Sequence, residues 1–281
     1  MILIVLIAEE LAVWQEHEQM LCPVVWITTK RGSGSGTIVY SEDRGDGCQT
    51  YVLTNYHTIE TAIRSATERS ALLQTDGKRE VTEEVKVEIF RYAYGRMKAL
   101  TDAYQAEIVA YNKEYDLALL RLKTSRQVPY VAKLLPAGVE VYGFQRIYVV
   151  SCSLLNPPIA AKGELNDVDD GEDRKQYWRG TANIVFGNSG GAVFTRYKGN
   201  YCLIGVPIRI EFVPDEFLKH RVWFVPIPRV WEWVKEEHLL FLVDSSVKPT
   251  ECFEKREKLR KEAERRLAAK SASEPTPAPR P

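Results

Sequence analysis

The stretch Gly187-Asn188-Ser189-Gly190-Gly191 decides the interpretation of this chain. It places one serine on a tight turn between the apolar runs 182–186 and 192–195. Glycines on both sides permit unusual backbone angles and the close approach of other groups, so that successive N–H groups can point at one spot beside the hydroxyl. Such a spot stabilises a developing oxyanion, and the N–H groups of Gly187 and Ser189 are the expected donors.

A serine hydroxyl is a weak nucleophile at its own pKa, so this interpretation requires a histidine base and a carboxylate that orients it. His57 ends the apolar segment Tyr51-Val-Leu-Thr-Asn-Tyr-His57, and Asp116 begins the equally apolar segment Asp116-Leu-Ala-Leu-Leu. Taken singly, each signal has a simpler explanation, because glycine-rich turns and structural His or Asp residues at strand ends are common. Together they form a candidate catalytic triad of His57, Asp116 and Ser189.

From residue 22 to about residue 227, short β-branched and aromatic runs alternate with turn residues, which predicts an all-β fold. The runs are 24–28, 36–40, 51–54, 85–92, 106–111, 117–122, 147–152, 192–195, 201–206 and 222–225. They suffice for two small antiparallel barrels, joined by a crossover at 123–138 that contains prolines. Residues 58–73 depart from this pattern, and their spaced apolar residues predict a short helix.

The C-terminal quarter has a different composition. Pro228 is a favourable first residue for a helix, and the run 230–234 that follows predicts a helix docked on the second barrel. Residues 251–270 hold eight basic and five acidic side chains, partly at i,i+4 spacing, which predicts a charged helical arm. The arm is a candidate for binding a partner, although a solvated helix is the simpler interpretation. The Pro-rich end is expected to be disordered.

The predicted organisation therefore has four parts. They are an N-terminal extension at 1–21, a first barrel at 22–128 with His57 and Asp116, a second barrel at 129–245 with Ser189, and the arm with its tail at 246–281.

Composition excludes several classes of function. Lys plus Arg and Asp plus Glu both number 38, so no net charge favours nucleic acid or an anionic membrane. The five cysteines are odd in number and scattered, which predicts reduced and mostly buried thiols rather than a disulfide framework or a zinc site. The apolar run 1–8 is shorter than the roughly 20 residues that span a bilayer and lacks a basic region before it. We expect a cytoplasmic protein without a membrane span.

No cofactor or metal is expected. The acidic stretch 166–173 does not fit the D-x-[DN]-x-[DN]-G calcium loop and is better explained as a solvated hairpin loop. His17, His220 and His238 have no neighbouring ligand set. The basic residues of the arm alternate with acids and lack aromatic partners, so a nucleic-acid partner is not expected.

The segments around the triad resemble the trypsin-like (chymotrypsin-fold) serine peptidases, and the HtrA-like branch most closely. The resemblance rests on Gly32-Ser-Gly-Ser-Gly, Leu53-Thr-Asn-Tyr-His57, Asp116-Leu-Ala-Leu-Leu, the serine pentapeptide and Phe224-Val-Pro-Ile-Pro228, and covers about residues 22–240. It implies two six-stranded antiparallel β-barrels with a C-terminal helix. It also implies a serine endopeptidase that acts on proteins or peptides; the alternative is a catalytically silent domain that binds peptides or serves as a scaffold.

The departures from the family pattern carry predictions of their own. The interval from His57 to Asp116 is 59 residues (116 − 57), longer than is usual in that branch, which predicts an insertion within 58–105. Only 53 residues follow Pro228 (281 − 228), and their composition predicts that no PDZ domain is present.

Two further residue roles are implied by the resemblance. Asn183 would lie at the base of the S1 pocket, with Ile208 and Ile210 on the strand that forms its wall, so the P1 residue is expected to be small to medium and uncharged. Asn188 stands where zymogen-activated relatives have an aspartate, so no activating cleavage is expected.

Overall fold

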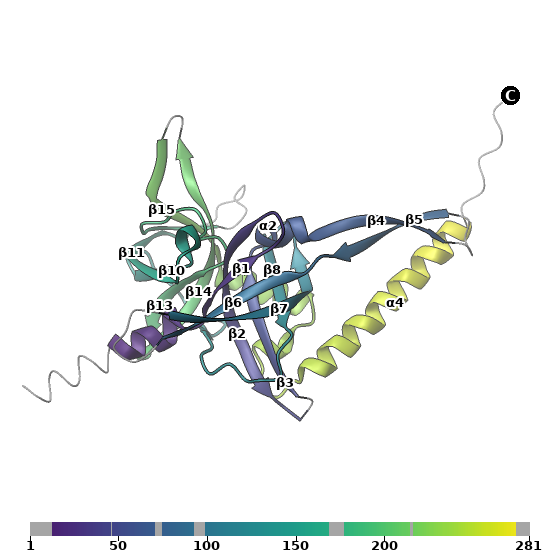
Figure 1. Ribbon diagram of the computed structural model, residues 1–281, viewed down its shortest axis with the longest axis horizontal. Helices are drawn as coiled ribbons and strands as arrows, with labels where there is room; N and C mark the ends of the chain where they lie inside the picture. Colours follow the sequence, from purple (N-terminus) through teal and green to yellow (C-terminus); the bar gives the residue numbers. More distant parts are fainter. Residues whose placement is uncertain are drawn as a thin grey trace, which may run out of the picture. The chain divides into compact units, whose positions relative to one another are not determined.

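Two β-barrels account for most of the strands in the computed structural model (Figure 1), which describes residues 13–45, 47–70, 75–92, 99–168, 177–213 and 216–273. The chain divides into two compact units, Met1–Trp231 and Glu232–Pro281, and both barrels belong to the first. A short π-helix, η1 (His17–Leu21), precedes the first strand. The Pro-rich end, 274–281, lies outside the described residues, as does the acidic stretch from 169 onward.

The first barrel is a closed sheet of six antiparallel strands in the order β1-β2-β3-β8-β7-β6. Its strands are β1 (Val24–Thr28), β2 (Ser33–Asp43), β3 (Cys48–Thr54), β6 (Val85–Tyr92), β7 (Ala99–Asn112) and β8 (Leu117–Leu122). Alternate residues of these strands point inward, and Val25, Ile27, Val52 and Leu120 are among the fully buried side chains of its core. Burial of these side chains is the main force that closes the barrel.

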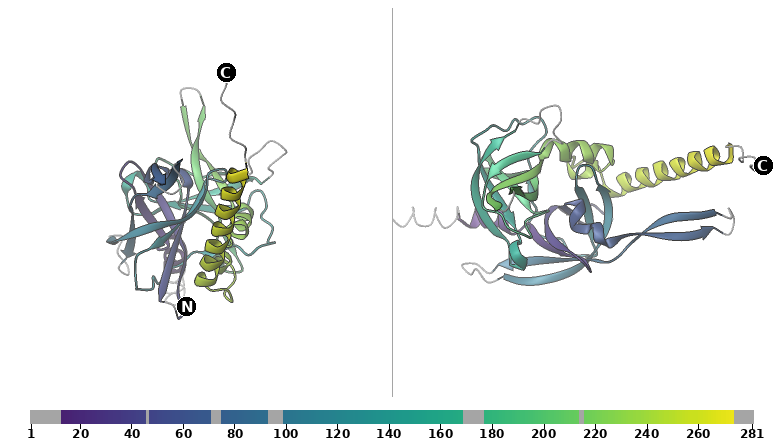
Figure 2. Two further views of the ribbon diagram at one scale, coloured as in Figure 1. Left: turned by 90° about the vertical axis from the view of Figure 1, so that its right-hand side faces the viewer. Right: turned by 90° about the horizontal axis from the view of Figure 1, so that it is seen from above.

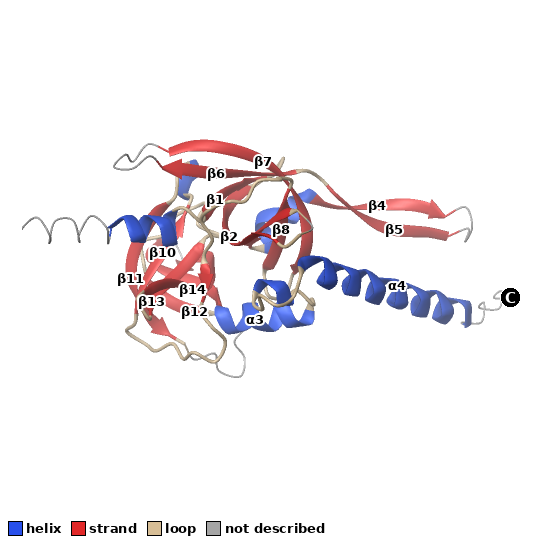
Figure 3. Cartoon of the chain, turned by 90° about the horizontal axis from the view of Figure 1, so that it is seen from below, coloured by secondary structure: helices blue, strands red, loops and turns tan. Residues whose placement is uncertain are grey.

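The second barrel closes because β13 pairs with both β10 and β14 (Figure 3). Its order is β13-β10-β11-β12-β15-β14, and a short parallel strand extends it beside β14. The strands are β9 (Lys133–Leu134), β10 (Arg146–Ser151), β11 (Ile159–Asp167), β12 (Trp178–Thr181), β13 (Ala192–Tyr197), β14 (Asn200–Val213) and β15 (Glu216–Pro226). The predicted fold of two six-stranded barrels is confirmed.

The predicted helix at 58–73 is wrong for residues 58–70, and the rest of that range lies outside the described residues. The helical turn that contains His57 is short, α2 (Tyr56–Ile59), and is followed by η2 (Glu60–Ala62). The chain then forms an antiparallel hairpin of β4 (Ile63–Ser70) and β5 (Thr75–Thr82). Ile59 and Ala62 are buried in the barrel core, and Ile63, at the start of β4, packs against it. These apolar residues therefore belong to the barrel rather than to one face of a longer helix. Figures 1 and 2 show the hairpin running out from the barrel, inside the interval where an insertion was expected.

Helices follow the second barrel. Helix α3 (Ile227–Glu236) begins one residue before Pro228, and the indole N–H of Trp231 donates to the carbonyl of Leu135 at 3.1 Å. The second unit contains η4 (Leu240–Leu242) and α4 (Pro249–Ser273), so the predicted charged arm is helical. Within this unit Arg256 pairs with Glu237 at 2.5 Å.

All five cysteines are free thiols, and all except Cys48 are buried, as predicted. Burial, with a smaller contribution from Glu18, raises the pKa of Cys22 to about 12, and burial also raises the pKa of Cys152. Such thiols stay protonated at neutral pH and are poor nucleophiles. In the described part of the chain, no helix has the length and apolarity that crossing a membrane requires.

Candidate active site

His57 and Asp116 form a hydrogen-bonded pair at one end of the first barrel. His57 lies in α2, directly after β3, and Asp116 ends the turn that leads into β8. The Asp116 Oδ2 atom is 2.7 Å from His57 Nδ1, and Asp116 Oδ1 accepts the backbone N–H of His57 at 2.9 Å. The Asp116 side chain is 17% exposed and that of His57 is 41% exposed, so the imidazole is open to solvent while its carboxylate partner is sheltered.

This pairing assigns the useful tautomer of the imidazole. A carboxylate accepts hydrogen bonds only, so the proton of neutral His57 belongs on Nδ1, which faces Asp116. The other ring nitrogen, Nε2, is then an acceptor. An imidazole in this state can take a proton from a hydroxyl that approaches Nε2.

The backbone at Asp116 is strained, and Asn55 stabilises it. Asp116 has a φ of +54°, a left-handed conformation that non-glycine residues rarely adopt. The buried side chain of Asn55 donates from Nδ2 to the Asp116 carbonyl at 2.9 Å. In the same turn, Asn112 Oδ1 accepts the N–H groups of Glu114 and Tyr115, each at 2.9 Å. Asn55 is thus a positioning residue, and nothing in the segment Leu53-Thr-Asn-Tyr-His57 signals that role.

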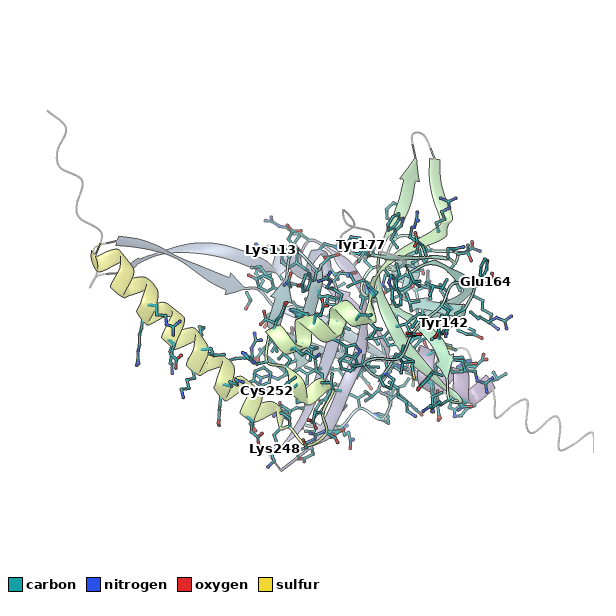
Figure 4. The ribbon with its side chains drawn as sticks, turned by 180° about the vertical axis from the view of Figure 1, so that it is seen from behind. Lys113, Tyr142, Glu164, Tyr177, Lys248 and Cys252 are labelled. Carbon is teal, nitrogen blue, oxygen red and sulfur yellow. The ribbon has the colours of Figure 1, made fainter. Side chains whose placement is uncertain are left out.

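Packing of Tyr56 holds α2 against the turn between β7 and β8. The ring centroids of Tyr56 and Tyr111 lie 5.3 Å apart. The ammonium of Lys113, labelled in Figure 4, lies 5.5 Å from the Tyr56 ring centroid, a favourable cation–π distance. These contacts hold Tyr56, the residue before His57, against the turn that carries Asp116.

The serine turn requires its glycines. Gly187 and Gly190 have φ values of +96° and +82°, which side chains other than hydrogen disfavour. A Cβ atom on Gly190 would lie 2.1 Å from the Ser35 carbonyl oxygen and 2.2 Å from Thr54 Oγ1. The pentapeptide can therefore approach the first barrel only with glycine at this position.

The first barrel holds the serine turn directly. The N–H of Ser35, in β2, donates to the Ser189 carbonyl at 2.8 Å, and Thr54 Oγ1 donates to the Ser35 carbonyl at 2.8 Å. A Cβ atom on Gly34 would lie 2.7 Å from the Thr58 side chain and 3.1 Å from the Ser189 carbonyl oxygen. Gly34 therefore lies between Thr58, the residue after His57, and the backbone of Ser189. The segments of the predicted triad thus meet where the two barrels adjoin.

The Ser189 hydroxyl is not bonded to His57 in this structure. It donates to the backbone carbonyl of Ile208, in β14, at 3.0 Å. Neither the N–H of Gly187 nor that of Ser189 donates to an acceptor within the described residues. Rotation of Ser189 about χ1 would release its hydroxyl from Ile208.

The residues predicted for the S1 pocket are placed only in part. Asn183 is exposed on the loop after β12, and Ile208 is buried within β14. Ile210 belongs to β14, but its side chain lies outside the described part of the chain, as does the side chain of His220. The S1 assignment stays a prediction. Among the described residues, no cluster of His, Cys, Asp or Glu could hold a metal ion.

Comparison with known proteins gives one family-model match. The family model described as the trypsin-like peptidase domain matches residues 34–206. Comparison with curated proteins gives no match.

Solved structures with a similar fold include a serine endoprotease from Yersinia pestis, at a TM-score of 0.55 and 17% identity over 79% of this chain and 65% of that one. Deg5 matches with a TM-score of 0.55 and 19% identity over 80% of this chain and 92% of that one. The MamO protease domain from Magnetospirillum magneticum matches with a TM-score of 0.53 and 16% identity, over 77% and 98%. The chain thus spans less than two thirds of the Yersinia endoprotease, and at these identities the likeness is one of fold.

Proposed function

The chain belongs to the family of trypsin-like peptidases, and we propose that it is a serine endopeptidase whose triad is His57, Asp116 and Ser189. The observation that carries the proposal is the bond between Asp116 Oδ2 and His57 Nδ1, with the backbone N–H of His57 fixing the second carboxylate oxygen. This arrangement orients the His57 imidazole so that its Nε2 atom can act as a base. The turn that carries Ser189 between glycines lies beside it.

The reaction would proceed in two stages. Ser189 Oγ attacks the carbonyl carbon of the scissile peptide while its proton passes to His57 Nε2, and the carbonyl oxygen becomes an oxyanion. The N–H groups of Gly187 and Ser189 donate to that oxyanion. The intermediate then expels the amine, which takes the proton from His57, and leaves an acyl ester on Ser189. Water then attacks the ester carbonyl as His57 takes its proton, the bond to Ser189 Oγ breaks, and His57 returns the proton to Oγ as the carboxylic acid product leaves.

A second candidate function is a catalytically silent domain that binds peptides. It is favoured by the bond from the Ser189 hydroxyl to the Ile208 carbonyl, which leaves the hydroxyl unconnected to its base. Hydrogen bonds of catalytic groups are often long or misaligned without substrate, so this geometry does not oppose catalysis. A fluorophosphonate separates the two candidates, because only an activated serine reacts with it.

We predict that the protein reacts with a fluorophosphonate without prior cleavage near its N-terminus. Asn188 is neutral and 6% exposed, so a newly formed ammonium inserted beside it would lose its hydration without gaining a charge partner. The measurement is labelling of freshly purified protein, with its N-terminus verified by intact mass and the adduct located on Ser189 by peptide mapping. Labelling that appears only after an N-terminal segment is removed would contradict this prediction.

We predict that the P1 residue is small to medium and uncharged. Asn183 offers no anion to lysine or arginine, and Ile208 adds apolar surface to the strand expected to form the pocket wall. Cleavage of a peptide library, followed by mass spectrometry, tests this prediction with the Ser189→Ala protein as the blank.

The matched variant for this prediction is Asn183→Asp. It places an anion at the expected pocket base and should raise cleavage after lysine and arginine by roughly tenfold or more relative to apolar residues. A dominant preference for these basic residues in the unmodified protein would refute the S1 assignment.

A further inference from the structure

We propose that Ser153 is a positioning residue that holds the oxyanion loop, defined as residues 185–190, in the conformation needed for catalysis. The inference rests on the proposed function, since it concerns the loop whose N–H groups would bind the oxyanion. Ser153 begins η3 (Ser153–Leu155), the helical turn that follows β10. It belongs to neither the triad nor the serine pentapeptide.

The hydroxyl of Ser153 bonds to the side chain next to the nucleophile. Ser153 Oγ donates to Asn188 Oδ1 at 2.8 Å, and the N–H of Val185 donates to the same oxygen at 3.3 Å. Ser153 is 4% exposed and Asn188 is 6% exposed, so water cannot readily replace the hydroxyl. A buried acceptor that loses its donor is destabilised by more than the small net gain of an ordinary hydrogen bond. The shorter of the two bonds to Asn188 therefore depends on Ser153.

Leu154, the residue after Ser153, fixes the peptide between Phe186 and Gly187, whose N–H is an expected oxyanion donor. The N–H of Leu154 donates to the Phe186 carbonyl at 3.0 Å. In a planar trans peptide, the carbonyl and the following N–H point in opposite directions, so this bond turns the N–H of Gly187 away from Leu154. Leu154 itself has a φ of +51°, and Asn156 Nδ2 donates to the carbonyls of Ser153 and Leu154, each at 3.2 Å. The turn that carries Ser153 is thus itself held in a bent form.

A second chain of bonds anchors the other side of Gly187. The hydroxyl of Ser35 donates to the Gly187 carbonyl at 2.7 Å and accepts the N–H of Cys152 at 2.8 Å. The residues from 152 to 154 therefore connect to the oxyanion loop at the carbonyls of Phe186 and Gly187 and at the side chain of Asn188. Of residues 152 to 154, only Ser153 hydrogen-bonds to the loop directly through its side chain. Replacing Ser153 by alanine therefore removes that contact without altering the backbone. Neither Ser153 nor Asn188 carries a charge. Their hydrogen bond therefore holds the loop without the ammonium group that a newly cleaved N-terminus would supply.

The test compares Ser153→Ala with Ser151→Ala by the second-order rate constant of fluorophosphonate labelling. Ser151 lies at the end of β10, is 1% exposed, and its hydroxyl has no hydrogen-bond partner among the described residues. It is therefore a matched buried serine. We expect Ser153→Ala to label about tenfold more slowly than the wild type, and Ser151→Ala to label at the wild-type rate. Ser153→Thr, which keeps the hydroxyl, should recover most of the loss.

Two further measurements separate positioning from a general loss of stability. Amide hydrogen exchange should accelerate in residues 185–191 of Ser153→Ala while the strands of the first barrel keep their protection. In a double-mutant cycle with Asn188→Ala, the double variant should label no more slowly than the slower single variant, because both changes break one contact.

Equal labelling rates for Ser153→Ala and Ser151→Ala would overturn the proposal, as would unchanged exchange in residues 185–191. The proposed function fails by a different result, which is a wild-type protein that does not label at all. In that case the exchange of residues 185–191 in Ser153→Ala alone decides whether Ser153 orders the loop.

Discussion

Replacement of Ser189 by alanine, or of His57 by alanine, is expected to lower kcat by roughly 10⁵- to 10⁶-fold. Alanine at 189 removes the nucleophile, and alanine at 57 removes the base that accepts its proton. Because the two groups act in one step, the double variant should be scarcely slower than either single variant. The measurement is hydrolysis of the best peptide found in the library, with fluorophosphonate labelling as the second readout.

The control for the histidine is His238→Asn. This residue has a φ of +52°, which asparagine tolerates, and it lies in the second unit of the chain. The variant should keep full activity. Melting temperatures of the Ser189 and His57 variants should match the wild type within a few degrees, because their side chains lie at the surface junction and fill no core. Substantial peptidase activity in purified Ser189→Ala would refute the mechanism.

Replacement of Asp116 by asparagine is expected to lower kcat by about 10⁴-fold. The backbone N–H of His57 faces one carboxylate oxygen, so the carbonyl oxygen of the new amide takes that position. The amide nitrogen, a donor, then faces His57 Nδ1, which has to become an acceptor. The ring proton moves to Nε2, and the imidazole can no longer accept the proton of Ser189.

The matched control is Glu114→Gln, which removes an exposed carboxylate from the same turn. It should change kcat less than about twofold, since a surface charge away from the reacting atoms has a small effect. Asp116→Asn should also keep the melting temperature, because the replacement has the same shape and Asn55 still bonds to the carbonyl of residue 116. A variant that retains more than about a tenth of wild-type kcat would show that Asp116 does not set the tautomer.

Much of the barrel architecture could be predicted from the alternation of side chains. The strands at 24–28, 85–92 and 117–122 have the predicted bounds, because their inward side chains are apolar and buried. Strand β11 was not predicted, since most of its residues are exposed or half-buried and its sequence shows no apolar face. The neighbouring β12 is only four residues long and holds a glycine. Pairing with other strands, which no local pattern reveals, makes both segments extended.

The candidate site, like the fold, could be predicted from the sequence only in part. His57, Asp116 and Ser189 could be named because each lies in a distinctive local motif. Ser153 and Asn55 have no such signal, since their partners Asn188 and Asp116 are 35 and 61 residues away in the sequence. A buried serine looks the same in sequence whether or not its hydroxyl is bonded. Only the folded arrangement distinguishes Ser153 from Ser151.

The bonds made by Ser35 have a consequence for when activity can appear during synthesis. Ser35 is on the first barrel, yet its N–H and hydroxyl bond to Ser189 and Gly187 of the second. A nascent chain whose first barrel alone has formed has a histidine and a carboxylate but no nucleophile. A second barrel formed alone has a serine turn without the Ser35 bonds that hold it. Under the proposed mechanism, hydrolysis begins only once the two halves have docked, so an unfinished chain would cleave neither its neighbours nor itself.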